Sequence, residues 1–213
     1  MERTNMLVLG IGAPAARLAK GLDAPLIDIG RDDPGEAVAE ATRRGVNLIL
    51  FVGCPDEALR PQPFEALSDT QWCEGVDRPL ELMLSTLHAL SARYQADPPP
   101  VVFAGPSMAL SGSDGLSLLA AVAEGQRALM KSAARQMGKR GFRFTWIAID
   151  TLLFAPELQG AELPKSQDPD PLATGSAADV GQLMALLSLL ADPRAKGIIG
   201  QSLVLDGGEL MLP

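Results

Sequence analysis

The stretch Met6-Leu-Val-Leu-Gly-Ile-Gly-Ala-Pro-Ala-Ala-Arg-Leu-Ala-Lys-Gly21 changes from a continuous apolar run to a helical pattern within a few residues. The run Met6–Leu9 has no polar position, which is typical of a strand buried on both faces of a parallel sheet. Gly10 and Gly12 mark a tight turn, and Pro14 falls in the first helical turn, where proline is well tolerated. The stretch predicts a buried strand followed directly by a helix.

The same alternation continues along the chain and predicts a doubly wound α/β fold with a Rossmann-like parallel sheet of about six strands. Further strands are expected at Leu26–Ile29, Asn47–Val52, Val101–Ala104, Phe142–Ile149 and Ser202–Asp206. Helices are expected at Ala13–Gly21, Pro34–Arg44, Gly75–Gln95, Gly115–Lys139 and Ala177–Leu190. A chain of 213 residues fits one such domain, 1–213. We expect Ala155–Gly175, rich in Pro, Asp and Gln, to be a flexible loop, either a lid or a plain surface loop.

The composition of the chain limits the classes of molecule that we expect it to bind. The formal net charge of -8 opposes binding to nucleic acids and to anionic membrane surfaces, so small molecules or proteins are the better partners. Cys54 and Cys73 are too few for a disulfide framework and lack the paired spacing of a zinc site, so no metal is expected. No stretch reaches transmembrane length. We therefore expect a cytoplasmic protein.

Three blocks of sequence resemble the short-chain dehydrogenase/reductase family. Asp192–Gly208, which ends in Leu-Val-Leu-Asp-Gly-Gly, resembles the family's last strand. Pro63–Trp72 resembles the segment that leads into the long helix after the fourth strand, and Ser132–Ile149 is similar to the end of the catalytic helix with the following strand. The resemblance implies a Rossmann-type sheet, a nicotinamide cofactor, and a dimer or tetramer built through helices 75–95 and 115–139.

The catalytic Tyr and Lys of that family do not carry over to this chain. The alignment implied by the resemblance places Leu119 at the Tyr position and Ala123 at the Lys position. The Tyr must exchange a proton with the substrate oxygen, and a nearby ammonium lowers its pKa. Leu and Ala offer neither a proton nor a charge. The single tyrosine, Tyr94, lies outside the relevant helix and has no Lys four residues after it.

The other two polar residues of the family's active site are also replaced. The substrate-orienting Ser falls near Pro106, and the helix Asn falls near Pro79. Ser107 lies one position later, so a slipped alignment would restore one polar group of the four. The chain is therefore interpreted as a member that lacks the Asn, Ser, Tyr and Lys of the family.

The phosphate-binding turn is shortened relative to the family. Gly10, Gly12 and Ala15 keep a Gly-x-Gly-x-x-Ala spacing after a strand, and the helix beyond them would offer free N–H groups to a pyrophosphate. Pro14 removes one of those donors. The same glycines also suit a tight turn with no ligand. Asp28 lies near the distance expected of a ribose-binding carboxylate, and it is equally compatible with a solvated loop.

A deletion weakens the nucleotide site further. The chain between Ile29 and Asn47 has room for one helix where the family fits helix, strand and helix, so one edge strand and its helix should be missing. In the family this region forms a wall of the adenine pocket. The Asn-Asn-Ala-Gly of the family becomes Phe51-Val-Gly-Cys54, which retains Gly53. We therefore expect no bound cofactor, with NAD(P) as the alternative.

The carboxyl ends of the strands would present Cys54, Asp56, Ser107 and Asp150. The candidates for other chemistry among them are Ser107, Asp150 and Cys54. A cysteine there could be a nucleophile if a base or a helix N-terminus activated it, or it could be a small buried apolar residue. Asp150 ends an apolar strand at the usual ligand edge, where it could also cap the loop. His88, the only histidine, sits in the middle of a helix.

Together these features predict an atypical short-chain dehydrogenase/reductase-like protein that has lost hydride transfer and acts as a binding or scaffold protein, or with altered chemistry. The alternative is an NAD(P)-dependent oxidoreductase with non-standard catalytic residues. A homodimer or tetramer and a small-molecule ligand are expected on either interpretation.

Overall fold

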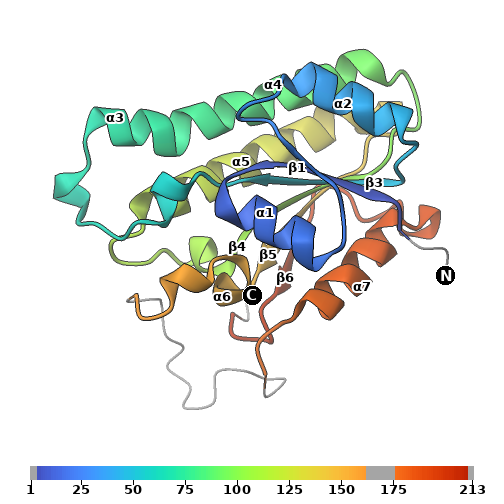
Figure 1. Cartoon of the computed structure of the whole chain (residues 1–213). Helices are drawn as coiled ribbons and strands as arrows, with labels where there is room; N and C mark the ends of the chain where they lie inside the picture. The colour runs from blue at the N-terminus through green and yellow to red at the C-terminus, as the bar shows by residue number, and fades with distance from the viewer. Residues whose placement is uncertain (1–3, 162–175, 211–213) are drawn as a thin grey trace.

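A computed structural model describes residues 4–161 and 176–210. Six parallel strands form one sheet in the order β2-β1-β3-β4-β5-β6 (Figure 1). The strands are β1 Met6–Ile11, β2 Leu26–Asp28, β3 Leu48–Gly53, β4 Val101–Pro106, β5 Phe144–Ile149 and β6 Ser202–Leu205. The helices are α1 Gly12–Gly21, α2 Pro34–Arg43, α3 Asp69–Trp72, α4 Arg78–Arg93, α5 Ser117–Met137, α6 Thr151–Phe154 and α7 Val180–Ala191. The doubly wound α/β fold expected from the sequence is confirmed.

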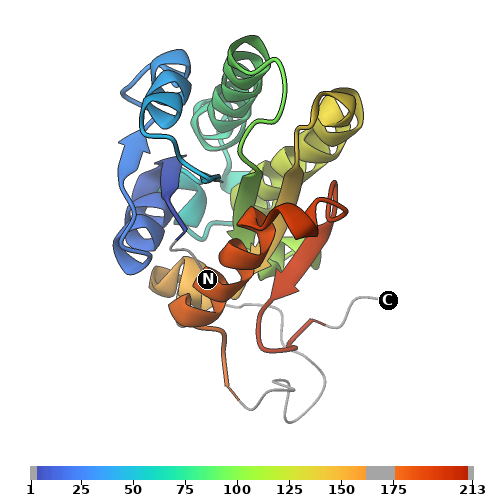
Figure 2. The same cartoon turned by 90° about the vertical axis from the view of Figure 1, so that its right-hand side faces the viewer.

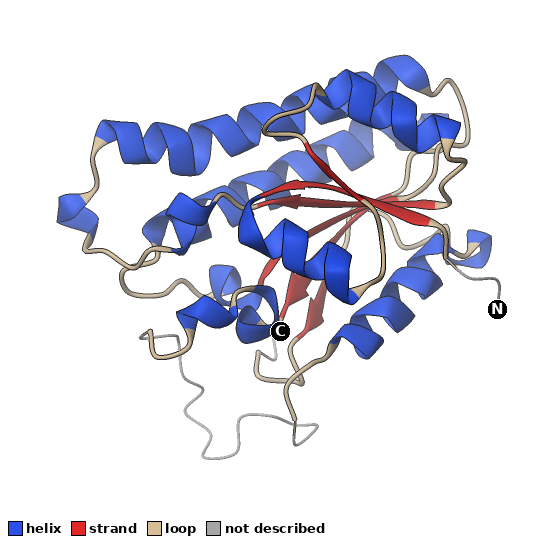
Figure 3. Cartoon of the chain, viewed as in Figure 1, coloured by secondary structure: helices blue, strands red, loops and turns tan. Residues whose placement is uncertain are grey.

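Helices cover both faces of the sheet. Helices α2, α4 and α5 lie on one face, and α1, α6 and α7 lie on the other (Figure 2). The strands run in one direction, so each connection returns along a helix, and the carboxyl ends of all strands meet at one edge (Figure 3). This edge is the usual ligand side of an open α/β sheet.

The four central strands are almost completely buried, which explains their continuous apolar sequences. The rings of Phe51, Phe103 and Phe144 form a row across β3, β4 and β5, with centroid separations of 5.3 Å and 5.9 Å. Aromatic rings at such separations stabilise a core beyond the area that they bury. The edge strands β2 and β6 are only partly buried.

The expected deletion is confirmed. One helix, α2, connects β2 to β3, and β2 forms the edge of the sheet beside β1. Asp33 caps this helix by accepting a hydrogen bond from the Glu36 N–H at 3.1 Å, and Pro34 occupies the first turn. The connection is therefore a compact, properly capped helix.

The segment Ala155–Gly175 differs in part from the expected flexible loop. Ala155 is fully buried and Leu158 is 1% exposed, so the chain immediately after α6 packs against the core in a 3-10 turn. Residues 162–175 lie outside the described part of the chain. Within the described residues, no helix is both long and apolar enough to cross a membrane.

Helices α4 and α5 use several of their small residues inside the chain. A Cβ at Gly125 would lie 3.0 Å from a methyl group of Leu80 on α4, and one at Gly75 would lie equally close to Leu118 of α5. Ala123 faces the sheet. These positions therefore allow α4 and α5 to approach each other and the sheet.

Gly105 in β4 offers a test of core packing. A Cβ at this position would lie 2.5 Å from Cζ2 of Trp146, a ring that is 1% exposed. We expect Gly105→Ala to lower the free energy of unfolding by about 1–3 kcal/mol, because the ring must shift in a dense core. Chemical denaturation measures the change. The control Gly197→Ala, with no atom within 4 Å of the new Cβ, should stay within about 0.5 kcal/mol of the parent. Equal effects of the two changes would contradict this packing.

Candidate active site at the carboxyl edge of the sheet

The sheet brings most of the candidate site residues to its carboxyl edge. Gly10 lies near the end of β1, Gly53 ends β3, and Cys54 follows it directly. Ser107 follows β4 and Asp150 follows β5. The sequence interpretation of where these residues lie is therefore correct, and their contacts decide what they can do.

The glycine turn is filled by the chain itself. A Cβ at Gly10 would lie 2.5 Å from the Val52 carbonyl oxygen and 2.6 Å from Cβ of the buried Ala15. Gly12 has φ +77°, and a Cβ there would lie 2.1 Å from the Cys54 carbonyl oxygen. These contacts require glycine at both positions without any ligand. The close packing of the turn against β3 therefore explains both glycines.

A carboxylate occupies the N-terminus of α1. Oδ1 of Asp56 accepts a hydrogen bond from the backbone N–H of Ala13 at 2.7 Å. Pro14, the next residue, has no N–H to offer. The first-turn donors and the helix dipole normally make such a terminus an anion site, and here the anion is a side chain of the same protein.

The neighbouring part of the cleft is closed by an ion pair. Arg17 of α1 donates from Nη1 to the Phe154 carbonyl oxygen at 2.7 Å and from Nη2 to Oε2 of Glu157 at 2.8 Å. This arginine joins α1 to α6 and the turn after it, which lie side by side in Figure 1. Phe154 is completely buried. Backbone and side chains therefore fill the space beside the glycine turn.

The remaining residues expected to bind a cofactor have partners of their own. Oδ1 of Asp28 accepts a hydrogen bond from Gly30 N–H at 3.0 Å, and its Oδ2 lies 3.4 Å from Nε of Arg31. The Gly53 carbonyl accepts a hydrogen bond from Nε2 of the buried Gln126 at 2.7 Å. Asp28 thus closes its own turn, and Gln126 of α5 covers the end of β3.

These contacts do not fit a dinucleotide. A pyrophosphate would need the N–H groups that Asp56 and Pro14 take away, and it would meet a carboxylate at close range. One N–H of the first helical turn is therefore used by Asp56, and another is absent because residue 14 is proline.

Leu119 and Ala123, the residues that the sequence resemblance placed at the Tyr and Lys positions, have apolar side chains in the core. Leu119 is fully buried and Ala123 is 3% exposed, both within the core that α5 makes with the sheet. Tyr94 lies just after α4, at the amino edge of the sheet, where its hydroxyl accepts a hydrogen bond from Thr42 at 3.0 Å. The tyrosine is therefore at the opposite edge from Ser107 and Asp150.

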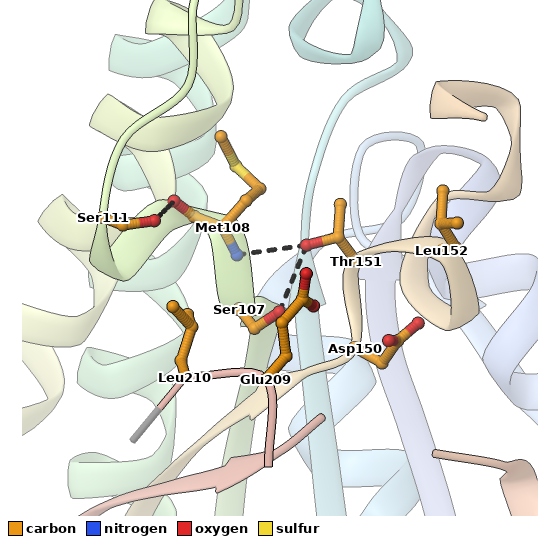
Figure 4. A pocket seen from close by; sticks show the side chains of 8 residues that line it. All are labelled: Ser107, Met108, Ser111, Asp150, Thr151, Leu152, Glu209 and Leu210. Atoms are coloured by element: carbon orange, nitrogen blue, oxygen red, sulfur yellow. Dashed lines mark hydrogen bonds between the residues drawn. The ribbon is translucent and has the colours of Figure 1, made fainter. Parts of the chain in front are cut away.

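A small pocket lies between the ends of β4 and β5 and the chain after β6 (Figure 4). Its volume is ≈ 80 Å³, below the roughly 300–1,000 Å³ of common ligand sites. The Ser107 and Thr151 hydroxyls lie 3.2 Å apart, and Met108 N–H donates to Thr151 Oγ1 at 3.1 Å. The lining residues are Ser107, Met108, Ser111, Asp150, Thr151, Leu152, Glu209 and Leu210.

The carboxylates near this pocket differ in their roles. Asp150 accepts a hydrogen bond from Leu153 N–H at 2.8 Å and so caps α6, as the structural interpretation of this residue predicted. Asp206 accepts hydrogen bonds from two backbone N–H groups of the chain after β6. Burial raises the pKa of Glu209, and the nearby charges of Asp150 and Asp206 raise it further. The protonated form of Glu209 is therefore favoured relative to an exposed glutamate.

Sequence reasoning missed Thr151 and Glu209. Thr151 directly follows a candidate residue, and Glu209 directly follows the Asp-Gly-Gly block, so both could have been found by extending the motifs by one residue. The sequence places Asp56 at a strand end, but its partner was not predicted. Its contact with Ala13 arises because β1 and β3 are neighbours in the sheet.

The Cys54 thiol is not an activated nucleophile in this structure. It is 3% exposed, and burial raises its pKa, with the carboxylates of Asp56 and Glu157 adding to the shift. A thiol is nucleophilic as the thiolate, so this group stays inert near neutral pH. His88 is exposed on α4. No group of three His, Cys, Asp or Glu side chains in the described residues could hold a metal ion.

Comparison with known proteins places the fold. Neither a protein-family model nor a curated protein sequence matches the chain. A short chain dehydrogenase from Burkholderia cenocepacia, in complex with NADP, has a TM-score of 0.69 at 17% identity, covering 98% of this chain and 99% of that chain. The 3-ketoacyl-(acyl-carrier-protein) reductase from Brucella melitensis, complexed with NADH, has a TM-score of 0.66 at 17% identity, covering 97% and 98%.

A third solved structure agrees with these two. An NADH-dependent reductase complexed with NAD has a TM-score of 0.70 at 14% identity, covering 99% of both chains. Agreement over nearly the whole length shows that this chain has the fold of short-chain dehydrogenases/reductases. Identity this low establishes the fold and leaves the activity to the site residues.

The raised pKa of Glu209 predicts how stability depends on pH. The folded state holds this proton more tightly than the unfolded state, so the group favours folding at low pH and opposes it as pH rises through the folded-state pKa. Glu209→Gln should therefore raise the Tm at pH 7 by up to about 2 °C, and the gain should vanish below about pH 4. Calorimetry across this range measures the difference. The exposed control Glu65→Gln should show no such pH-dependent gain.

Proposed function

We propose that this chain is an atypical protein of the short-chain dehydrogenase/reductase type that has lost hydride transfer and acts through binding, as a ligand-binding or scaffold protein. The observation that carries the proposal is the hydrogen bond from Ala13 N–H to Asp56. It gives the N-terminus of α1 an internal anion. Cofactor binding would have to break this bond and bring two anions close together, which is unfavourable by Coulomb repulsion even though Asp56 is exposed to solvent.

The positions normally used for catalysis support the same conclusion. A carbonyl reduction needs a proton donor beside the substrate oxygen and a donor of hydride. Leu119 and Ala123 are apolar and buried, and the glycine turn makes its own contacts. Because the acid and the cofactor site are altered independently, restoring one of them would leave the other missing.

The alternative is an NAD(P)-dependent oxidoreductase with non-standard residues. One observation favours it: Glu209, whose pKa is raised by burial and by neighbouring carboxylates, lines the same pocket as the Ser107–Thr151 hydroxyl pair. A protonated carboxyl group at this edge could donate a proton to a substrate oxygen. NADP, NADH and NAD were found with the three similar structures, which keeps this cofactor class as the one to test.

Nucleotide binding distinguishes the two functions. We expect NADH and NADPH at about 1 mM to leave the Tm of the parent protein unchanged, because stabilisation follows the ratio of ligand to Kd. If Asp56 is the obstacle, Asp56→Ala should bind the nucleotide better than the parent does. Asp33→Ala is the matched control, since it removes the N-cap of α2 at a similar expected loss of about 1 kcal/mol. A saturable shift of the parent protein at micromolar nucleotide would overturn the proposal.

Catalysis is tested with the same proteins. We expect the purified parent protein to oxidise neither NADH nor NADPH in the presence of aldehydes or ketones, measured by absorbance. Turnover that is lost in both Ser107→Ala and Glu209→Gln would establish the alternative. Leu119→Tyr combined with Ala123→Lys should remain inactive, because the glycine turn still lacks its phosphate donors.

We also propose that α4 and α5 form the contact of a homodimer or larger assembly. Leu84 of α4 is 44% exposed, and Ala121 of α5 is partly exposed. Val122, the next residue, is 1% exposed and belongs to the core, so it cannot form the contact. Ala121 is therefore the position at which a charge reports on assembly.

Light scattering tests the assembly. We expect a mass above 22.4 kDa for the parent protein, and a shift toward that monomer mass for Ala121→Glu, because the charge would be desolvated in the contact. Ala39→Glu on α2, at a similarly half-buried alanine, is the matched control and should keep the parent mass. A monomer at every concentration would refute this proposal without affecting the nucleotide experiment.

A further inference from the structure

A groove runs along the amino edge of the sheet, opposite to the candidate active site. Its first part, of ≈ 360 Å³, lies between α5 and the loop that leads into β6, and its residues include Lys131, Arg135 and Gln201. Its second part, of ≈ 690 Å³, lies among the loops that lead into β4, β5 and β6. Ile199 lines both parts, so they are adjacent. We call this region the amino-edge groove.

The groove is basic in a protein whose net charge is -8. Lys131, Arg135, Arg143 and Lys196 line it. None of them forms an ion pair with another described residue. By contrast, ion pairs engage Arg17, Arg31, Arg43, Arg44, Arg127 and Arg194. Lys131, Arg135 and Lys196 are therefore available to an external anion.

Arg143 is the least exposed of these cations. Its Nη1 donates to the carbonyl oxygens of Leu190 and Asp192 at 3.2 Å and 3.1 Å, at the end of α7. The Asp192 carboxylate is bound by Arg194, so the partners of Arg143 are neutral carbonyls. Burial lowers the pKa of Arg143, although the charge of Asp192 opposes the shift. This half-buried charge would be stabilised by an anion in the groove.

Helix C-termini also attract cations, and Arg135 lies in the last turn of α5. Lys131 lies one turn earlier on the same face, beyond the range of that effect. Lys196 is exposed in the loop before β6, and its side chain has no hydrogen bond or ion pair among the described residues. Capping of helix ends therefore explains part of this charge and leaves Lys131 and Lys196 unexplained.

The rest of the lining is apolar and closely fitted. Pro98, Phe142, Pro193 and Ile199 line the groove beside the cations. Small residues form its floor, since a Cβ at Gly200 would lie 3.5 Å from Cβ of Ala134. Asp97 is the single acidic residue in the lining. The groove thus combines an anion-binding end with an apolar surface that a hydrocarbon or aromatic group could cover.

We propose that the amino-edge groove binds a small organic anion, with its phosphate or carboxylate group between Lys131 and Arg135 and its apolar body over Ile199. Planar guanidinium and ammonium groups bind such oxygens through charge-assisted hydrogen bonds. The Gln201 side chain lies at the same end. This site is separate from the carboxyl edge, so it goes beyond the proposed function and stands or falls independently of the nucleotide experiment.

Phenyl phosphate is a suitable probe. Inorganic phosphate represents its anionic group alone, and benzyl alcohol represents its aromatic group without the charge. We expect saturable binding of phenyl phosphate in amide NMR titrations, with shifts at Gly197, Gly200 and Gln201 and none at Ser107 or Thr151. Benzyl alcohol should not bind, and inorganic phosphate should bind at least about tenfold more weakly. No saturable shift below about 10 mM phenyl phosphate would overturn the proposal, as would shifts confined to the carboxyl edge.

Charge variants separate a defined site from general attraction. Lys131→Gln with Arg135→Gln should weaken phenyl phosphate binding by about tenfold or more, because two charge-assisted hydrogen bonds are lost. Lys20→Gln with Arg60→Gln removes the same charge from exposed positions outside the groove and should leave the affinity within about twofold. Equal weakening in both double variants would show nonspecific attraction and reject the site.

The apolar contact is tested by Ile199→Ser. This change should weaken the binding of phenyl phosphate but not the binding of inorganic phosphate. The opposite result would reject the apolar contact.

Discussion

Burial of the central strands on both faces is the constraint on which the rest of this structure depends. Strands β1, β3, β4 and β5 are covered on both sides, so their side chains are apolar along almost their whole length. Polar chemistry can then appear only at the two edges, where the strands meet their loops. The contacts that side chains make at each edge therefore decide which ligands the protein can bind there.

The carboxyl edge has become part of the scaffold. Asp56 caps α1, Asp150 caps α6, and Arg17 joins these two helices. Each contact supplies a partner to a group that a ligand would otherwise satisfy, and a satisfied buried group gains little from a ligand. The hydrogen bonds that stabilise this edge thus use groups that a ligand could otherwise contact. At the amino edge, Lys131, Arg135 and Lys196 form no ion pair with another described residue, so they are available to a ligand.

The sequence indicated the fold well because its signals are local. Continuous apolar runs identified the strands, and the single helix between Ile29 and Asn47 identified the missing edge strand. The alignment of Leu119 and Ala123 also needed no structure, since neither residue type can transfer a proton. The boundaries of the helices and strands differ from the predicted ones by a few residues, and the segment after Ile149 is more compact than its composition suggested.

The sequence by itself therefore determined the strand and helix order and the parallel sheet. Tertiary structure alone decided that the glycine turn is occupied, because Ala13 and Asp56 are far apart in the chain and meet only through the pairing of β1 with β3. It also decided that Lys131 and Arg135 of α5 lie beside the loop that leads into β6. Contacts between distant segments depend on packing, which periodicity and spacing along one chain do not encode.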